Sequence, residues 1–178
     1  GTYYGGLDCF DGKVFTHYNH RDGDAGTISE DRICSLKEDS EHNLMVGTLS
    51  AGLNILDKNR KVVISYKFDG DTAKNSIHSN YISSLIEDKR KNIWVVTAYG
   101  VDLLLKSNHK FIHYLHEDNK PNGLINNNTN NILADKDGLI WISTREGISI
   151  FDYKTGKFTT INKPDGLPDT TVIDIKQY

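Results

Sequence analysis

The 178-residue chain has little cysteine, proline or methionine and lacks any long hydrophobic run. Its two cysteines, Cys9 and Cys34, do not repeat at equivalent positions, which argues against a disulfide framework or a cysteine-rich metal site. The apolar runs fall far short of the roughly 20 residues that span a bilayer. A signal peptide has a positively charged start followed by an apolar stretch, and these residues do not show that pattern.

The sequence also lacks a concentration of charge of one sign. Twenty-one lysines and arginines are scattered among 24 acidic residues, and the net charge is −3. Nucleic acids and anionic lipids are bound by basic stripes or patches, which this pattern does not provide. We therefore expect this segment to bind no nucleic acid and to make no direct contact with a membrane. A hydrophobic content of 37% is sufficient for a packed core.

What the sequence does contain is a repeat. An apolar run closed by threonine, and followed within five residues by glycine and an aliphatic residue, occurs three times, and the chain opens on a fourth such threonine. The threonines are Thr2, Thr48, Thr97 and Thr144, so their spacings are 46, 49 and 47 residues. A fixed period of this length indicates a repeat architecture, in which each unit is one supersecondary structure that packs on its neighbours.

Each unit shows four short strand-like patterns and no helical periodicity. A strand with small or polar middle residues comes first, followed by a strand that carries Trp94 or Trp141 in two of the units. A strand starting with the glycine and a strand with apolar residues three apart complete the unit. Four strands in a repeat of about 47 residues are typical of a β-propeller blade.

We therefore predict an all-β segment of a β-propeller with four-stranded antiparallel blades. The expected repeat units are residues 1–32, 33–81, 82–128 and 129–171, with the start of another at 172–178. Three complete blades are expected at about 33–67, 82–115 and 129–161. Two outer strands of an earlier blade and one inner strand at 172–175 would bring the total to 15 strands.

The motifs resemble a known repeat family. The stretches are Ile86–Thr97, Ala134–Thr144 and Gly147–Phe158, in which aspartate, tryptophan, threonine and glycine recur at fixed spacing. They resemble the two-component regulator propeller repeat across essentially the whole chain. Met45, Leu105 and Thr129 depart from the pattern.

This resemblance implies a function. In that family such repeats build the extracytoplasmic sensor of hybrid two-component systems of gut bacteria, which detect oligosaccharides and control genes for polysaccharide utilisation. The expected location is periplasmic, in the extracytoplasmic part of an inner-membrane protein whose histidine kinase lies outside this segment. The segment itself is expected to have no catalytic activity, no catalytic residues and no cofactor.

A ligand site is predicted where the long crossing connections and the turns after the tryptophan strands converge. Tyrosine can stack on a sugar ring, and arginine can bind a carboxylate or sulfate with two hydrogen bonds. Tyr99 and Arg145 are the first candidates. The further candidates, from equivalent turns and from a crossing connection, are Tyr3, Tyr4, Ser50 and Arg21.

Two other interpretations remain open. The segment could belong to a propeller polysaccharide lyase or glycosidase, because fold does not decide function. Its blades could also serve only packing or dimer contacts. A metal site at His113 and His116 is not expected, because residues three apart on a strand point to opposite faces. Finally, blade faces left uncovered at the two ends of the segment predict self-association.

Overall fold

The computed structural model describes residues 1–71 and 75–176. Regular structure in these residues is β-strand, apart from one short 3₁₀ helix at Lys163–Asp165. Within the same ranges, no helix combines the length and the apolar character that a membrane span requires.

The described residues form 14 strands in four antiparallel sheets. Blade 1 pairs β1 (Leu7–Phe10) with β2 (Phe15–Tyr18), and each of the other sheets has four strands in chain order. Blade 2 comprises β3 (Ile33–Glu38), β4 (Leu44–Thr48), β5 (Leu53–Leu56) and β6 (Val62–Tyr66). Blade 3 comprises β7 (Ile82–Glu87), β8 (Ile93–Thr97), β9 (Val101–Leu105) and β10 (Lys110–Tyr114). Blade 4 comprises β11 (Thr129–Ala134), β12 (Ile140–Thr144), β13 (Gly147–Asp152) and β14 (Lys157–Ile161). The predicted all-β propeller segment is confirmed.

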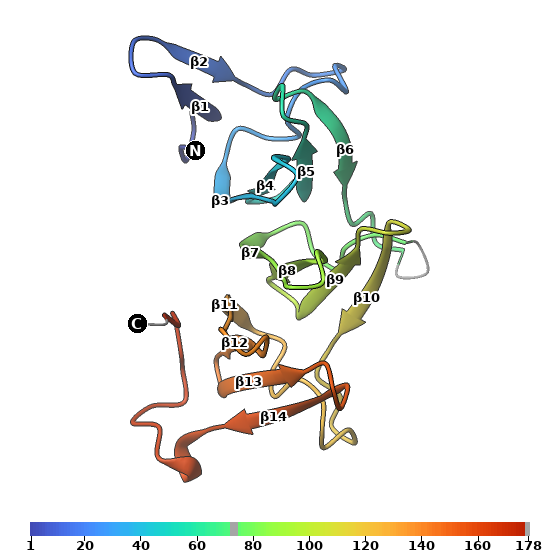
Figure 1. Ribbon diagram of the computed structural model, residues 1–178, viewed down its shortest axis with the longest axis vertical. Coiled ribbons are helices and arrows are strands. Elements are labelled where there is room, and N and C mark those ends of the chain that lie inside the picture. Colours follow the sequence, from blue (N-terminus) through green and yellow to red (C-terminus); the bar gives the residue numbers. More distant parts are fainter. Residues whose placement is uncertain (72–74, 177–178) are drawn as a thin grey trace.

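The blades follow one another in an arc, and their first strands β3, β7 and β11 lie next to each other on its concave side (Figure 1). Small polar side chains join these strands: Ser35 Oγ donates to the Ile82 carbonyl at 3.2 Å, and Ser84 Oγ donates to Asn131 Oδ1 at 2.7 Å. The pairing of each first strand with the second shifts register at its second residue. The small middle residues of these strands therefore permit close packing around the axis, as the sequence indicates.

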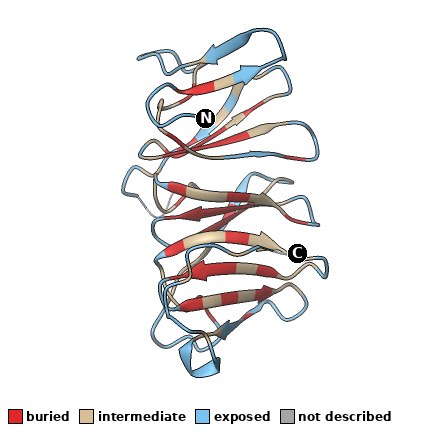
Figure 2. Ribbon diagram, turned by 90° about the vertical axis from the view of Figure 1, so that its left-hand side faces the viewer, coloured by how far each residue is buried: buried red, intermediate tan, exposed pale blue. Residues whose placement is uncertain are grey.

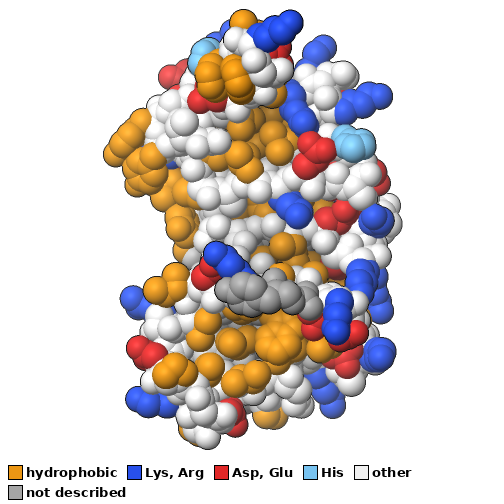
Figure 3. Space-filling view, turned by 60° about the vertical axis from the view of Figure 1, so that its left-hand side comes forward, with side chains coloured by type: hydrophobic (Ala, Val, Ile, Leu, Met, Phe, Trp, Pro, Cys, Tyr) orange, Lys and Arg blue, Asp and Glu red, His pale blue; other side chains and the backbone are white. Residues whose placement is uncertain are grey.

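Burial depends on whether a blade has a neighbour on both faces. Every residue of β8 in blade 3 is buried, which explains its uninterrupted apolar sequence. Blade 1 is covered on one side only, and most of its two strands is exposed (Figure 2). Its stacked Phe10 and Phe15 side chains are more than half exposed. Hydrophobic side chains also form several separate surface patches seen from the concave side (Figure 3). Self-association through the open blade faces stays a prediction.

An aspartate and a tryptophan lock the turn between the first and second strands of blades 3 and 4. In blade 3, Asp88 Oδ1 accepts the backbone N–H groups of Arg90 and Asn92, and its Oδ2 accepts the Trp94 indole N–H at 2.9 Å. Asp135 and Trp141 repeat this arrangement in blade 4, with an indole bond of 2.8 Å. The side chain of Trp94 is fully buried, whereas Trp141 is partly exposed.

The prediction of a strand at 172–175 is wrong, although the segment does lie next to blade 4. Val172 N donates to the Thr144 carbonyl at 2.9 Å, and Asn130 Nδ2 donates to the Val172 carbonyl at 2.8 Å. The segment thus lies beside blade 4, but residues 171–176 form no ladder. A propeller strand is held by the second strand of its own blade, and no further strand follows among the described residues.

Candidate ligand-binding rim

One threonine and one glycine build the same turn in every repeat, and together these turns form what we call the Thr–Gly rim. In blade 3, Thr97 Oγ1 donates to the Gly100 carbonyl at 3.1 Å and accepts the Tyr99 backbone N–H at 3.0 Å. The corresponding pairs are Thr2 with Gly6, Thr48 with Gly52, and Thr144 with Gly147. The repeated threonine is therefore a turn-forming residue that is buried in blades 2, 3 and 4, and two or three residues separate it from the glycine.

The turn brings its glycine against the end of the outermost strand. Gly52 has a φ of +83°, and a Cβ there would lie 2.1 Å from the Tyr66 carbonyl oxygen. Gly100 and Gly147 have the same left-handed backbone and approach the carbonyls of Tyr114 and Ile161. Only glycine fits both the conformation and the space. The rim turns are consequently held in one geometry, which presents the intervening side chains to solvent.

The two leading candidates lie in equivalent turns. Tyr99 in the β8–β9 turn is 53% exposed, and Arg145 in the β12–β13 turn is also exposed. Within residues 1–71 and 75–176, neither the Tyr99 hydroxyl nor the Arg145 guanidinium has a polar partner. Tyr3 and Tyr4 occupy the corresponding turn of blade 1, with their rings edge to face at 4.7 Å. These four side chains are available to a ligand.

Ser50 lies in the same series of turns, but its polar groups are already used. Its backbone N–H donates to Glu30 Oε2 at 2.7 Å, and its Oγ accepts from Arg32 Nη2 at 2.8 Å. Glu30 and Arg32 are also paired with each other. A ligand at this position would meet the Glu30–Arg32 pair at least as readily as the serine.

Arg21 lies elsewhere. The crossing connection that carries it packs on Val62–Ser65 of the outer strand β6, beside a groove of about 580 Å³. Its Nε is 3.6 Å from Asp24 Oδ2. The structure thus separates Arg21 from Ser50, Tyr99 and Arg145, because the crossing connection starts from the outermost strand of a blade.

Sequence reasoning missed the residues that precede each first strand. The backbone N–H after each rim threonine donates to the carbonyl of such a residue; these bonds are Leu49 to Arg32, Ala98 to Tyr81 and Arg145 to Asn128. Arg32, Tyr81 and Asn128 therefore line the Thr–Gly rim on the side of the first strands. Their fixed position, immediately before the small-residue strand, is the signal that could have identified them.

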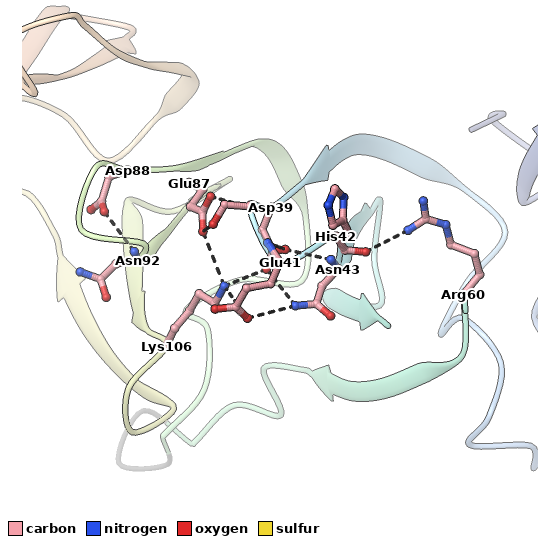
Figure 4. Close-up of polar contacts among 10 residues, drawn as sticks. Asp39, Glu41, His42, Asn43, Arg60, Glu87, Asp88, Asn92 and Lys106 are labelled. Atoms are coloured by element: carbon pink, nitrogen blue, oxygen red, sulfur yellow. Dashed lines mark hydrogen bonds and ion pairs between the residues drawn. The ribbon is translucent and has the colours of Figure 1, made fainter. Parts of the chain in front are cut away.

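The opposite rim carries an ion cluster that joins blade 2 to blade 3 (Figure 4). Lys106 Nζ, from the β9–β10 turn, lies 2.9 Å from Asp39 Oδ2 and 3.1 Å from Glu41 Oε2. Glu87 is 3.5 Å from the same ammonium group. It also accepts both the backbone N–H and the hydroxyl of Ser40. The contacts cross the blade boundary, so this cluster is an interblade connection.

Asp39 corresponds to Asp88 and Asp135, but blade 2 has Met45 where the other blades have tryptophan. The Asp39 Oδ2 atom accepts from Lys106 and Asn43 instead of an indole. Burial by itself would raise the pKa of Asp39, but hydrogen bonds from Asn43, Lys106 and Glu41 outweigh it and lower this pKa. Burial acts to lower the pKa of Lys106, and its bonds to Asp39 and Glu41 raise it overall.

These opposite shifts predict a pH window for Asp39→Asn. Because the folded-state pKa of Asp39 lies below the unfolded value of about 3.9, its stabilising effect is complete above that pH and is lost as the pH falls through the folded pKa. We expect the substitution to lower the free energy of unfolding by about 1–2 kcal/mol at pH 7, less than for a fully buried pair. Urea unfolding between pH 2 and 7 measures the difference.

The control for this prediction is Glu41→Gln, which removes an exposed carboxylate from the same lysine. Its effect at pH 7 should stay within about 0.5 kcal/mol. A difference between Asp39→Asn and the unchanged chain that persists undiminished at pH 2 would contradict the assigned role of the Asp39 charge.

Comparison with known families agrees with the repeat geometry. Residues 76–99 and 123–146 match the family model named two component regulator propeller. Two of the repeats in this chain thus match the two-component regulator propeller repeat. Both matched segments run from a crossing connection to the Thr–Gly rim, and so contain the first two strands of blades 3 and 4. None of the curated proteins matches the chain.

Solved structures contain similar propeller repeats. The extracellular domain of a putative hybrid two-component system from B. thetaiotaomicron is 26% identical, with a TM-score of 0.70 over 92% of this chain and 21% of its own length. Virginiamycin B lyase from Staphylococcus aureus is 12% identical, with a TM-score of 0.65 over 89% of this chain and 49% of that protein. The lyase shares the fold alone. The chain spans about a fifth of the hybrid-system domain.

Proposed function

We propose that these repeats form part of the extracytoplasmic sensor of a hybrid two-component regulator and bind an oligosaccharide at the Thr–Gly rim. The observation that carries the proposal is the similarity to the extracellular domain from B. thetaiotaomicron, which extends over 92% of this chain. The family match in blades 3 and 4 supports it. The proposed location is the periplasm, and the proposed role is binding without catalysis.

The exposed side chains of the rim suit a sugar. Tyr81 and Tyr99 both belong to blade 3 and are 37% and 53% exposed, so their rings can stack on the apolar face of a pyranose. Arg145 in the next blade has a guanidinium free of protein partners in the described residues and can bind a carboxylate or sulfate through two N–H groups. This combination favours an acidic or sulfated oligosaccharide over a neutral one.

The proposal predicts selective losses of affinity in the complete propeller domain that contains this segment. An oligosaccharide array identifies a ligand, and calorimetry then measures its dissociation constant. We expect Tyr99→Ala and Arg145→Ala each to weaken binding at least about tenfold, which corresponds to roughly 1.4 kcal/mol. Tyr99→Phe should retain affinity because it keeps the ring. Lys58→Ala, in an exposed turn on the opposite rim, is the matched control.

Two outcomes would overturn this assignment. Unchanged affinity in both alanine variants would leave these blades with a packing role. Turnover of the bound oligosaccharide by the purified domain would favour the lyase or glycosidase interpretation.

A further inference from the structure

Each complete blade uses one buried polar side chain to hold the crossing connection that enters it. The residue two positions after the rim glycine accepts a backbone N–H from that connection. Ser29 N donates to Asn54 Oδ1 at 3.1 Å, and Ile125 N donates to Ser149 Oγ at 3.0 Å. In blade 3 the acceptor is a carboxylate, since His78 N donates to Asp102 Oδ2 at 2.8 Å. All three acceptor side chains are fully buried.

Blade 2 surrounds this position with neutral groups that satisfy one another. Asn54 Nδ2 donates to Ser29 Oγ at 2.8 Å, and Ser65 Oγ donates to Asn54 Oδ1 at 2.8 Å. Ser29 comes from the crossing connection, and Ser65 is the cross-strand partner of Asn54 on β6. This position can therefore be filled by an uncharged hydrogen-bonded network.

Blade 3 places two histidines at these same two positions. His78 comes from the crossing connection, and His113 is the cross-strand partner of Asp102 on β10. The Nδ1 atom of His113 is 2.7 Å from Asp102 Oδ1, and that of His78 is 3.4 Å from the same oxygen. One ligand atom from each of the three residues lies within 4.8 Å of the other two.

The hydrogen bonding of this cluster is incomplete. The Nδ1 atom of His78 is buried and has no hydrogen-bond partner among the described residues, because its 3.4 Å approach to Asp102 does not meet hydrogen-bond geometry. The His78 and His113 ring centroids are only 3.9 Å apart, so two protonated rings would repel each other beside a single carboxylate. A bound cation would neutralise Asp102 and give the unpaired nitrogen a partner.

The donor set suits a borderline transition metal. Imidazole nitrogen and carboxylate oxygen bind Zn²⁺ at about 2.0–2.2 Å, which places the ligands of a tetrahedral ion roughly 3.4 Å apart. The separation of His78 Nδ1 from Asp102 Oδ1 already has this value. Phe68 stacks on His78, and Phe111 stacks on His113, so apolar rings flank both imidazoles. Such an apolar shell controls solvent access to a metal site and its local dielectric.

We propose that His78, Asp102 and His113 form a binding site for a divalent transition-metal cation, with Zn²⁺ as the best match to the ligand types. The bound ion replaces the His113–Asp102 hydrogen bond and fixes the crossing connection to β9 and β10. A fourth position remains for water or an external ligand. The histidine spacing in the sequence does not reveal this site, because its ligands come from three separate elements.

His116 is not a ligand in this arrangement. Its Nδ1 is 2.8 Å from the Leu124 carbonyl oxygen, as His20 Nδ1 is from that of Ile28 in an equivalent connection. The sequence-based objection to a His113–His116 pair therefore does not apply to the proposed site.

The test compares the chain with a variant that carries the blade 2 residues at the three positions. This variant is His78→Ser, Asp102→Asn and His113→Ser. Both proteins are freed of metal with a chelator and titrated with zinc chloride by calorimetry, and with cobalt chloride by visible absorption. We expect one saturable site in the unchanged chain, and we expect the variant to bind zinc at least about 100-fold more weakly. Zinc should raise the melting temperature of the unchanged chain only.

A second variant controls for other histidines. His17→Ser removes the exposed His17–Asp8 pair, which occupies the cross-strand position of blade 1 but has no counterpart of His78 in the described residues. It should retain full affinity. If the triple variant does not fold by circular dichroism, Asp102→Asn alone provides the comparison. Equal zinc binding with and without the cluster, or no saturable binding in the unchanged chain, would overturn the proposal.

Discussion

Replacing Trp94 with alanine is expected to lower the free energy of unfolding by about 3–5 kcal/mol, the range for removing a large buried aromatic side chain. Trp94 is fully buried between blades 3 and 4, where its ring stacks on Tyr114 at 5.2 Å and contacts Phe151 at 5.4 Å. The substitution opens a cavity and also deprives the buried Asp88 of the indole donor. Chemical denaturation followed by circular dichroism measures the effect.

Trp141→Ala is the matched control, because Trp141 makes the same indole bond to an aspartate but is partly exposed. Its expected loss is about 1–3 kcal/mol, since less area is removed from water. Trp94→Phe separates the effect of the cavity from that of the lost indole donor, because it keeps an aromatic ring without the N–H group. Equal losses for Trp94→Ala and Trp141→Ala would contradict the assignment of burial as the cause.

The second large effect is expected from Gly52→Ala. The left-handed backbone costs an L-residue about 1–2 kcal/mol. The new Cβ would also lie 2.1 Å from the Tyr66 carbonyl, which belongs to strand β6 and cannot move without disturbing the sheet. With an overpacking term of about 1–3 kcal/mol, we expect a total loss of roughly 2–5 kcal/mol. The melting temperature and denaturation midpoint report it.

Gly156→Ala distinguishes conformation from crowding. Gly156 has a φ of +67°, but no heavy atom of the described residues lies within 4 Å of a Cβ placed there. The loss should therefore be only about 1–2 kcal/mol. If Gly52→Ala costs no more than Gly156→Ala, the close approach of the rim turn to the outer strand is not a structural constraint.

The sequence was sufficient to predict the blades, because each blade is a local unit in which Thr97 and Gly100, or their equivalents, recur at fixed spacing. It also identified Tyr99 and Arg145 as exposed turn residues. It did not separate Arg21 from them, since that requires the path of a crossing connection. The His78, Asp102 and His113 cluster was equally inaccessible to it. Residues far apart along the chain converge there only after the strands have paired.

The last wrongly expected feature, the strand at 172–175, has a related cause. Its apolar pattern is suitable for a strand, but the described residues offer it no strand to pair with. Local sequence thus determined what each element could form, whereas neighbouring elements determined what it did form.

The aspartate in the turn between the first two strands of a blade binds a side chain from the following blade. This pairing between neighbours constrains how the repeats can be rearranged in evolution. Tyr153 of blade 4 donates to Asp88, and Lys106 occupies the corresponding position of blade 3 and binds Asp39. Burial, reinforced by Asp88, raises the pKa of Tyr153, so this phenol remains a donor. The neutral donor meets the aspartate already bonded to tryptophan, and the cation meets the aspartate without one. Duplicating or exchanging blades by recombination would mismatch these partners. The side chains at the blade boundaries therefore pair correctly only when the repeats keep their present order.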